Sequence, residues 1–132
     1  MKTPIALILS LAALPVAAQD TSAIADIIDE QMQAFEARDI DRAFSFASPS
    51  LQRMFGSAEI FGHMVENGYS TVWNNTSVSY LALRQERGQW VQRVMVQDAE
   101  GAIVLFDYYM IENGDSWQID AVTPIDVPAG MA

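Results

Sequence analysis

Apolar side chains in the first half of the chain recur every three or four residues, which is the spacing of one face of a helix. Four such segments follow residues suited to capping a helix N-terminus, namely Ser22, Asp39, Ser48 and Ser57. The predicted helices run from residue 22 towards residue 38, over 40–47, over 49–55 and over roughly 58–66. This half of the chain is therefore predicted to form a layer of helices.

After Tyr69 the pattern changes to alternating apolar and polar residues, which is typical of β-strands. The predicted strands cover residues 76–86, 89–98, 102–112 and 116–123. Short turn sequences separate them, and Arg87-Gly88 and Asn113-Gly114 are the clearest examples. The predicted fold is α+β, with N-terminal helices packed on a curved antiparallel meander of about four strands.

The third predicted strand is apolar on both of its alternating faces, so it is expected to be central and covered twice. Helices can cover only one side of the sheet. The second side then requires a pocket, a strongly curled sheet or another subunit, and a homodimer is one prediction. A monomeric mass in light scattering at high micromolar concentration would count against that dimer.

The first 18 residues have the three parts of a secretory signal peptide: Lys2, an apolar run and the small residues Ala17-Ala18 before Gln19. Residues 19–132 are predicted to form a single domain, with a core over about 22–123 and a tail over 124–132. The apolar run is too short to remain as a membrane anchor, and without cysteine no lipid can be attached at the cleavage site. The expected location is the periplasm or the medium.

The net charge limits the partners that the chain can bind. It is −10 for the full chain and becomes −11 once the signal peptide, whose one charge is Lys2, is removed. Such a charge repels nucleic acids and anionic membranes. His63 is the one histidine and is expected at the surface; with no cysteine, we predict no transition metal, and no cofactor motif is present.

The helical half of the chain contains several distinctive motifs. In chain order these are Gln31-Met-Gln-Ala-Phe35, Ala43-Phe44-Ser-Phe-Ala-Ser-Pro49, Phe55-Gly56, Phe61-x-x-Met-Val65 and Tyr69. Together they resemble a family of exported bacterial proteins, domain of unknown function 4864, over residues 24–119. The order of elements resembles the cone-shaped nuclear-transport-factor-2-like, or cystatin-like, superfamily. The resemblance implies the cone fold and export, and it carries over no catalytic residues.

Asp107 interrupts the most apolar strand, where an unpaired carboxylate costs several kcal/mol. One hypothesis places Asp107 in the cone as a general base, with a tyrosine such as Tyr109 as the acid, in a small isomerase, cyclase or dehydratase of the ketosteroid-isomerase type. The alternative is that Asp107 pairs with Arg93 on a neighbouring strand.

Five residues are candidates for the lining of a ligand pocket: Tyr69, Trp73, Tyr80, Gln92 and Tyr108. Aromatic rings can stack on a ligand and tyrosine hydroxyls can orient it. The chain has no assembled set of catalytic residues, which favours a non-catalytic module that binds a small apolar ligand or a protein partner over the isomerase hypothesis.

Overall fold

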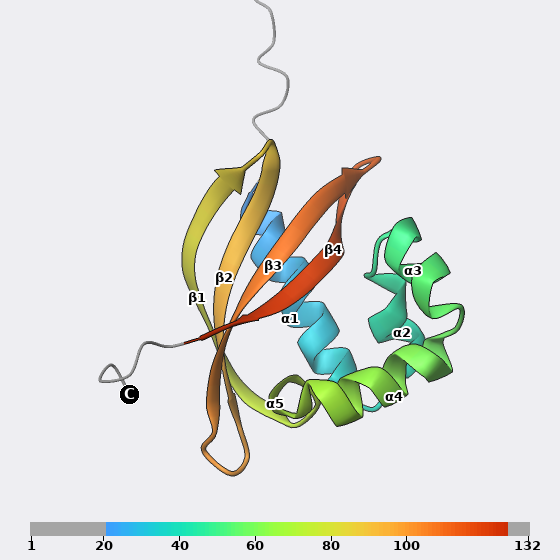
Figure 1. Ribbon diagram of the computed structural model, residues 1–132, viewed down its shortest axis with the longest axis vertical. Coiled ribbons are helices and arrows are strands. Elements are labelled where there is room, and N and C mark those ends of the chain that lie inside the picture. The colour runs from blue at the N-terminus through green and yellow to red at the C-terminus, as the bar shows by residue number, and fades with distance from the viewer. Residues whose placement is uncertain (1–20, 127–132) are drawn as a thin grey trace, which may run out of the picture.

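The computed structural model describes residues 21–126 and contains the predicted helices and the predicted antiparallel meander (Figure 1). The helices are α1 Ser22–Glu36, α2 Ile40–Ser45, α3 Pro49–Phe55, α4 Ala58–Gly68 and α5 Ser70–Trp73. The strands are β1 Asn75–Glu86, β2 Gln89–Asp98, β3 Ile103–Asn113 and β4 Ser116–Ile125. The predicted α+β class is confirmed.

The strands lie in the order β1-β2-β3-β4, and all neighbours are antiparallel. Figure 1 shows a strongly twisted sheet with α1 running along one side, while α2, α3 and α4 gather next to β4. Phe106, Tyr108 and Met110 of β3 join the buried core that includes Ile28 and Met32 of α1. Alternate residues of β3 therefore face the helices, and β3 lies in the middle of the sheet as predicted.

The N-terminal caps agree with the sequence at three of four helices. Asp39, Ser48 and Ser57 each accept a hydrogen bond from a backbone N–H three residues later, at 3.2 Å. Ser22, predicted as the cap of α1, lies inside that helix instead, and the cap position belongs to Thr21, whose side chain makes no cap hydrogen bond. The capping residues thus predicted the starts of α2, α3 and α4 correctly, and the predicted cap of α1 was one residue too late.

Helix α4 packs against the rest of the protein through its buried residues Phe61, Gly62 and Val65, whereas Ile60 is 55% exposed. A Cβ at Gly62 would lie 2.9 Å from Cγ2 of Ile40. The absence of a side chain at this position allows α4 to approach α2 closely.

Strand β4 and helix α5 differ from the prediction. Strand β4 continues to Ile125, beyond the predicted end at residue 123, because Pro124 lies on an edge strand, where a missing N–H is tolerated. Helix α5 was not predicted, since its four residues are too few for a periodic signal. The predicted signal peptide and residues 127–132 of the predicted tail lie outside the described residues.

A backbone bridge holds the segment between α2 and α3 against β4. The N–H of Ser48 donates to the carbonyl of Ile119 and the N–H of Ile119 donates to the carbonyl of Phe46, both at 2.8 Å. The Ser48 hydroxyl also donates to Asp120 Oδ1 at 2.8 Å. These bonds place α3 beside β4, on the helix side of the sheet.

None of the helices in the described part of the chain is both long and apolar enough to cross a bilayer.

Candidate ligand-binding site

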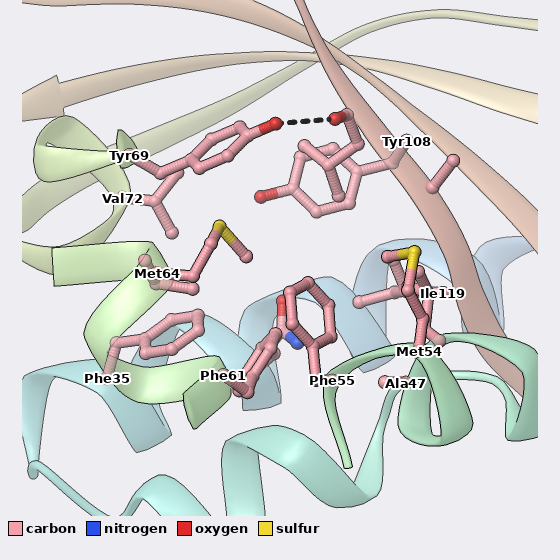
Figure 2. A pocket seen from close by; sticks show the side chains of 15 residues that line it. Phe35, Ala47, Met54, Phe55, Phe61, Met64, Tyr69, Val72, Tyr108 and Ile119 are labelled. Atoms are coloured by element: carbon pink, nitrogen blue, oxygen red, sulfur yellow. Dashed lines mark hydrogen bonds between the residues drawn. The ribbon is translucent and has the colours of Figure 1, made fainter. Parts of the chain in front are cut away.

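An apolar pocket of about 230 Å³ lies between the helices and strands β3 and β4 (Figure 2). Its walls come from α1, the α2–α3 connection, α3, α4, α5 and the two strands. The lining residues are Gln31, Phe35, Ala47, Leu51, Met54, Phe55, Phe61, Met64, Val65, Tyr69, Val72, Tyr108, Ile119, Ala121 and Val122. None of these side chains is charged, so the pocket offers an apolar environment formed by segments far apart in the sequence.

Aromatic rings centred on Phe61 form one end of this pocket. The Phe61 ring lies 5.9 Å from that of Phe35, 5.3 Å from that of Phe44 and 5.5 Å from that of Phe55, measured between centroids. The planes are tilted or edge-on, which are the favourable arrangements for aromatic pairs. Phe35 is fully buried, so this end of the pocket is anchored to the core.

The other end of the pocket carries two tyrosines. The Tyr69 hydroxyl donates to the carbonyl of Val122 at 3.0 Å, which is the hydrogen bond drawn in Figure 2. Tyr108 is 1% exposed, and its hydroxyl points into the pocket with no hydrogen bond drawn to any other lining residue. Burial raises the pKa of Tyr108, and the neighbouring Tyr69 raises it further, so the Tyr108 hydroxyl is neutral and carries a proton to donate.

The pocket reaches the surface beside α3. Leu51, Met54 and Phe55 of this helix line the pocket, yet no residue of α3 is fully buried, and Met54 is 68% exposed. This side of the pocket is thus formed by the short helix α3, whose N-terminus is capped by Ser48. A ligand can approach the pocket along this side.

Two of the five predicted ligand-binding residues, Tyr69 and Tyr108, line the pocket. Trp73 does not; its ring packs on Phe35 and under the guanidinium of Arg38, which lies 4.2 Å from the ring centroid. Arg38 also donates to the Trp73 carbonyl at 2.6 Å. Trp73 therefore contributes to the joint between α1 and α5.

Tyr80 and Gln92 also lie outside the pocket lining. The Tyr80 hydroxyl is 2.5 Å from Asp29 Oδ1 on α1, and burial together with this hydrogen bond raises the pKa of Tyr80. The Gln92 amide donates to the carbonyls of Leu81 and Arg93 at 3.1 and 2.9 Å, where the register of β1 and β2 shifts. Both side chains hold strand β1 in place.

Asp107 lies on the other face of β3 and is not among the residues that line the pocket. Arg93 donates to its two oxygens at 2.9 and 3.1 Å, and Arg84 donates at 3.0 Å. Burial raises the pKa of the Asp107 carboxyl, but the hydrogen bonds and charges of both arginines outweigh it, so the pKa lies below its ordinary value. Tyr109 projects from the same face as Asp107 and does not line the pocket.

This arrangement does not support the isomerase hypothesis, in which Asp107 is the general base. A general base needs a pKa near the working pH and a place beside the substrate, whereas Asp107 is a fully paired carboxylate outside the pocket. The pairing with Arg93 is the alternative that the sequence left open. The homodimer predicted from the apolar outer face of β3 stays a prediction.

Most lining residues were predicted as core positions of helices and not as site residues. Their helical spacing is the same whether they fill a core or surround a cavity, so periodicity alone does not separate the two. A more specific signal was present in the motif Phe61-x-x-Met64-Val65, because all three of its named residues line the pocket. His63, between them, is exposed as predicted.

A second hollow between α2 and α4 is polar, and His63 and Glu66 are among its lining residues. Within residues 21–126 no group of three or more histidine, cysteine or acidic side chains is placed to hold a metal ion.

Comparison with known proteins gives one family. The family model described as Domain of unknown function (DUF4864) matches residues 17–132. The searches of curated proteins and of solved structures gave no match. Membership of the nuclear-transport-factor-2-like superfamily, implied by the order of elements, stays a prediction.

Proposed function

The chain belongs to the family described as Domain of unknown function (DUF4864), and from this premise we propose that it is a non-catalytic protein that binds a small apolar molecule. The observation that carries the proposal is the pocket of about 230 Å³, because small molecules bind in concave, mostly apolar pockets with a few polar groups. An apolar cavity of this kind gains free energy when an apolar ligand fills it.

The family motifs gather around the pocket, which supports the proposal. Eight of the 15 lining residues belong to the motifs through which the sequence resembles the family. These are Gln31, Phe35, Ala47, Phe55, Phe61, Met64, Val65 and Tyr69. The Ala47-Ser48-Pro49 motif also carries the bridge to Ile119 that positions the α3 wall.

The chemistry of the lining favours binding over turnover. It contains no carboxylate, histidine, lysine or serine. Its one side-chain hydroxyl that points into the pocket without a hydrogen bond to another lining residue is that of Tyr108, whose pKa is raised. General acid–base catalysis requires a group that exchanges a proton near the working pH, and none of these side chains meets that condition.

Filling the pocket from within tests this function. Ala47 lines the pocket beside Ile119, its partner in the β-bridge, and Ala47→Leu adds three carbon atoms there. The added carbon atoms occupy space that the ligand would otherwise fill, and each buried methylene is worth about 0.8 kcal/mol. The variant is therefore expected to bind α-methylstyrene at least tenfold more weakly in isothermal titration calorimetry. Ala102→Leu, at an exposed position outside the pocket lining, is the matched control and is expected to bind as the wild type does.

Two results would overturn the proposal: no binding by the wild type, or equal binding by the wild type and Ala47→Leu. The melting temperature of each variant, measured without ligand, separates loss of binding from loss of folding. Absence of binding by a folded wild type would leave a protein partner as the remaining function of the apolar pocket.

We also propose that the protein acts outside the cytoplasm, on the basis of Lys2, the apolar run and the Ala17-Ala18 site. Intact-mass measurement of the protein from a bacterial periplasmic extract is expected to give a chain that starts at Gln19. A mass that includes residues 1–18 in the soluble fraction of the cytoplasm alone would contradict export.

A further inference from the structure

We infer that the ligand of this pocket is a neutral molecule of about ten non-hydrogen atoms with one carbonyl-type oxygen that accepts a hydrogen bond from the Tyr108 hydroxyl. This inference rests on the proposed function and adds the chemical class of the ligand. Three properties of the pocket carry it: a buried hydroxyl that points inward, the volume, and the absence of charge.

The hydroxyl of Tyr108 is the polar group that the pocket presents to a ligand. The side chain is 1% exposed, and its oxygen points into the free space of the pocket, away from its own strand (Figure 2). A ligand that fills the pocket displaces water from this hydroxyl, and a hydroxyl then left without a hydrogen bond costs about 1–3 kcal/mol. A ligand that only donates hydrogen bonds would leave the phenolic hydrogen unpaired, so an acceptor oxygen on the ligand satisfies this group best.

The volume sets the size of the ligand. At about 230 Å³ the pocket is smaller than those of drug-sized ligands, which start near 300 Å³. It is larger than an apolar cavity of about 150 Å³ that holds benzene. One ring with a short substituent fits this range, whereas a fused multi-ring molecule exceeds it.

The lining excludes a charged ligand. No lysine, arginine or histidine lines the pocket, so a carboxylate would lose its hydration without gaining a cation. The net charge of −10 further opposes the entry of anions. The Tyr108 hydroxyl, held neutral by burial, donates to an uncharged oxygen without this cost.

The two ends of the pocket fix the orientation. The phenylalanine rings around Phe61 lie at the end remote from Tyr108 in Figure 2, with Met64 to one side. The apolar ring of the ligand would pack on these phenylalanines, where edge-on contacts are favourable. Its oxygen would then point towards β3 and Tyr108.

Three probes with nine non-hydrogen atoms each separate the contributions: acetophenone, its alkene isostere α-methylstyrene, and benzoate. A hydrogen bond contributes about 0.5–1.5 kcal/mol net, so the wild type is expected to bind acetophenone roughly three- to tenfold more tightly than the isostere in isothermal titration calorimetry. Benzoate is expected to bind at least a hundredfold more weakly than acetophenone, because its charge is buried without a partner.

Tyr108→Phe removes the donor and keeps the ring. In this variant the preference for acetophenone over α-methylstyrene is expected to disappear or reverse. The carbonyl oxygen of acetophenone then loses its hydrogen bonds to water on binding and gains none from the protein. Tyr109→Phe is the matched control, since Tyr109 is the next residue of β3 and faces away from the pocket. It is expected to retain the wild-type preference.

The outcomes distinguish the two levels of the proposal. If the folded wild type binds neither neutral probe, the proposed function fails. If it binds α-methylstyrene as tightly as acetophenone, the pocket binds ligands but the assigned ligand class is wrong. A ketone preference that persists in Tyr108→Phe would also overturn the role of Tyr108.

Discussion

Phe61→Ala is expected to lower the free energy of unfolding by about 3–5 kcal/mol, the range for removing a buried aromatic ring. Phe61 is 6% exposed and its ring contacts those of Phe35, Phe44 and Phe55. Its loss would enlarge the existing pocket into a larger void that the surrounding helices cannot close. Urea denaturation at neutral pH measures the change.

Phe46→Ala provides the matched comparison, because Phe46 is only partly buried and lies outside both the pocket lining and the ring cluster. It is expected to cost less than half as much. Equal losses in the two variants would contradict the central place of Phe61. Enlarging the pocket should also raise the size of the ligand that it admits.

Asp107→Asn is expected to destabilise the fold by about 2–3 kcal/mol at neutral pH, below the usual cost of breaking a fully buried pair because the arginines are partly hydrated. The side chains of Arg84 and Arg93 are about a third exposed, whereas that of Asp107 is 3% exposed. Without the carboxylate, two guanidiniums face each other across β1–β3 with no shared counter-charge. Urea denaturation of both proteins gives the difference.

The same pair of proteins reports the pKa of Asp107. Since the folded-state pKa lies below the unfolded value, this carboxylate stabilises the fold above its ordinary pKa, near 4. That stability is lost as the pH falls through the lower folded-state pKa. The difference between wild type and Asp107→Asn is therefore expected to shrink below about pH 4.

Asp115→Asn, in the exposed turn between β3 and β4, is the control and is expected to leave stability and its pH dependence almost unchanged. A gap between wild type and Asp107→Asn that stays constant from pH 7 to pH 2 would contradict the role assigned to this carboxylate.

Local signals in the sequence predicted most of the fold. Caps at Asp39, Ser48 and Ser57, and the turn at Arg87-Gly88, depend on neighbouring residues only, and the structure confirms them. The sequence also suggested that Asp107 pairs with Arg93 on a neighbouring strand, and the two residues lie opposite each other in the antiparallel pairing of β2 and β3. These features are set by the backbone period and by turn chemistry.

The site depended on contacts that no local pattern contains. Arg84 reaches Asp107 because β1 shifts its register between Tyr80 and Leu83, and such a bulge leaves no clear trace in the alternation. The pocket exists because the bridge between Ala47 and Ile119 joins segments about seventy residues apart. Of the residues predicted from the sequence to bind a ligand, Tyr69 and Tyr108 line the pocket, whereas the lining residues of α3 and α4 were not predicted as site residues.

The most direct test of the pocket is a methyl NMR titration with ¹³C-methyl methionine and α-methylstyrene. Met54 and Met64 line the pocket, whereas Met32 and Met95 do not, so the chain contains its own controls. Saturable shifts of the Met54 and Met64 methyl signals, with those of Met32 and Met95 unchanged, are the predicted result. Shifts that are absent, or equal at all four methionines, would contradict a ligand site between α3, α4 and β4.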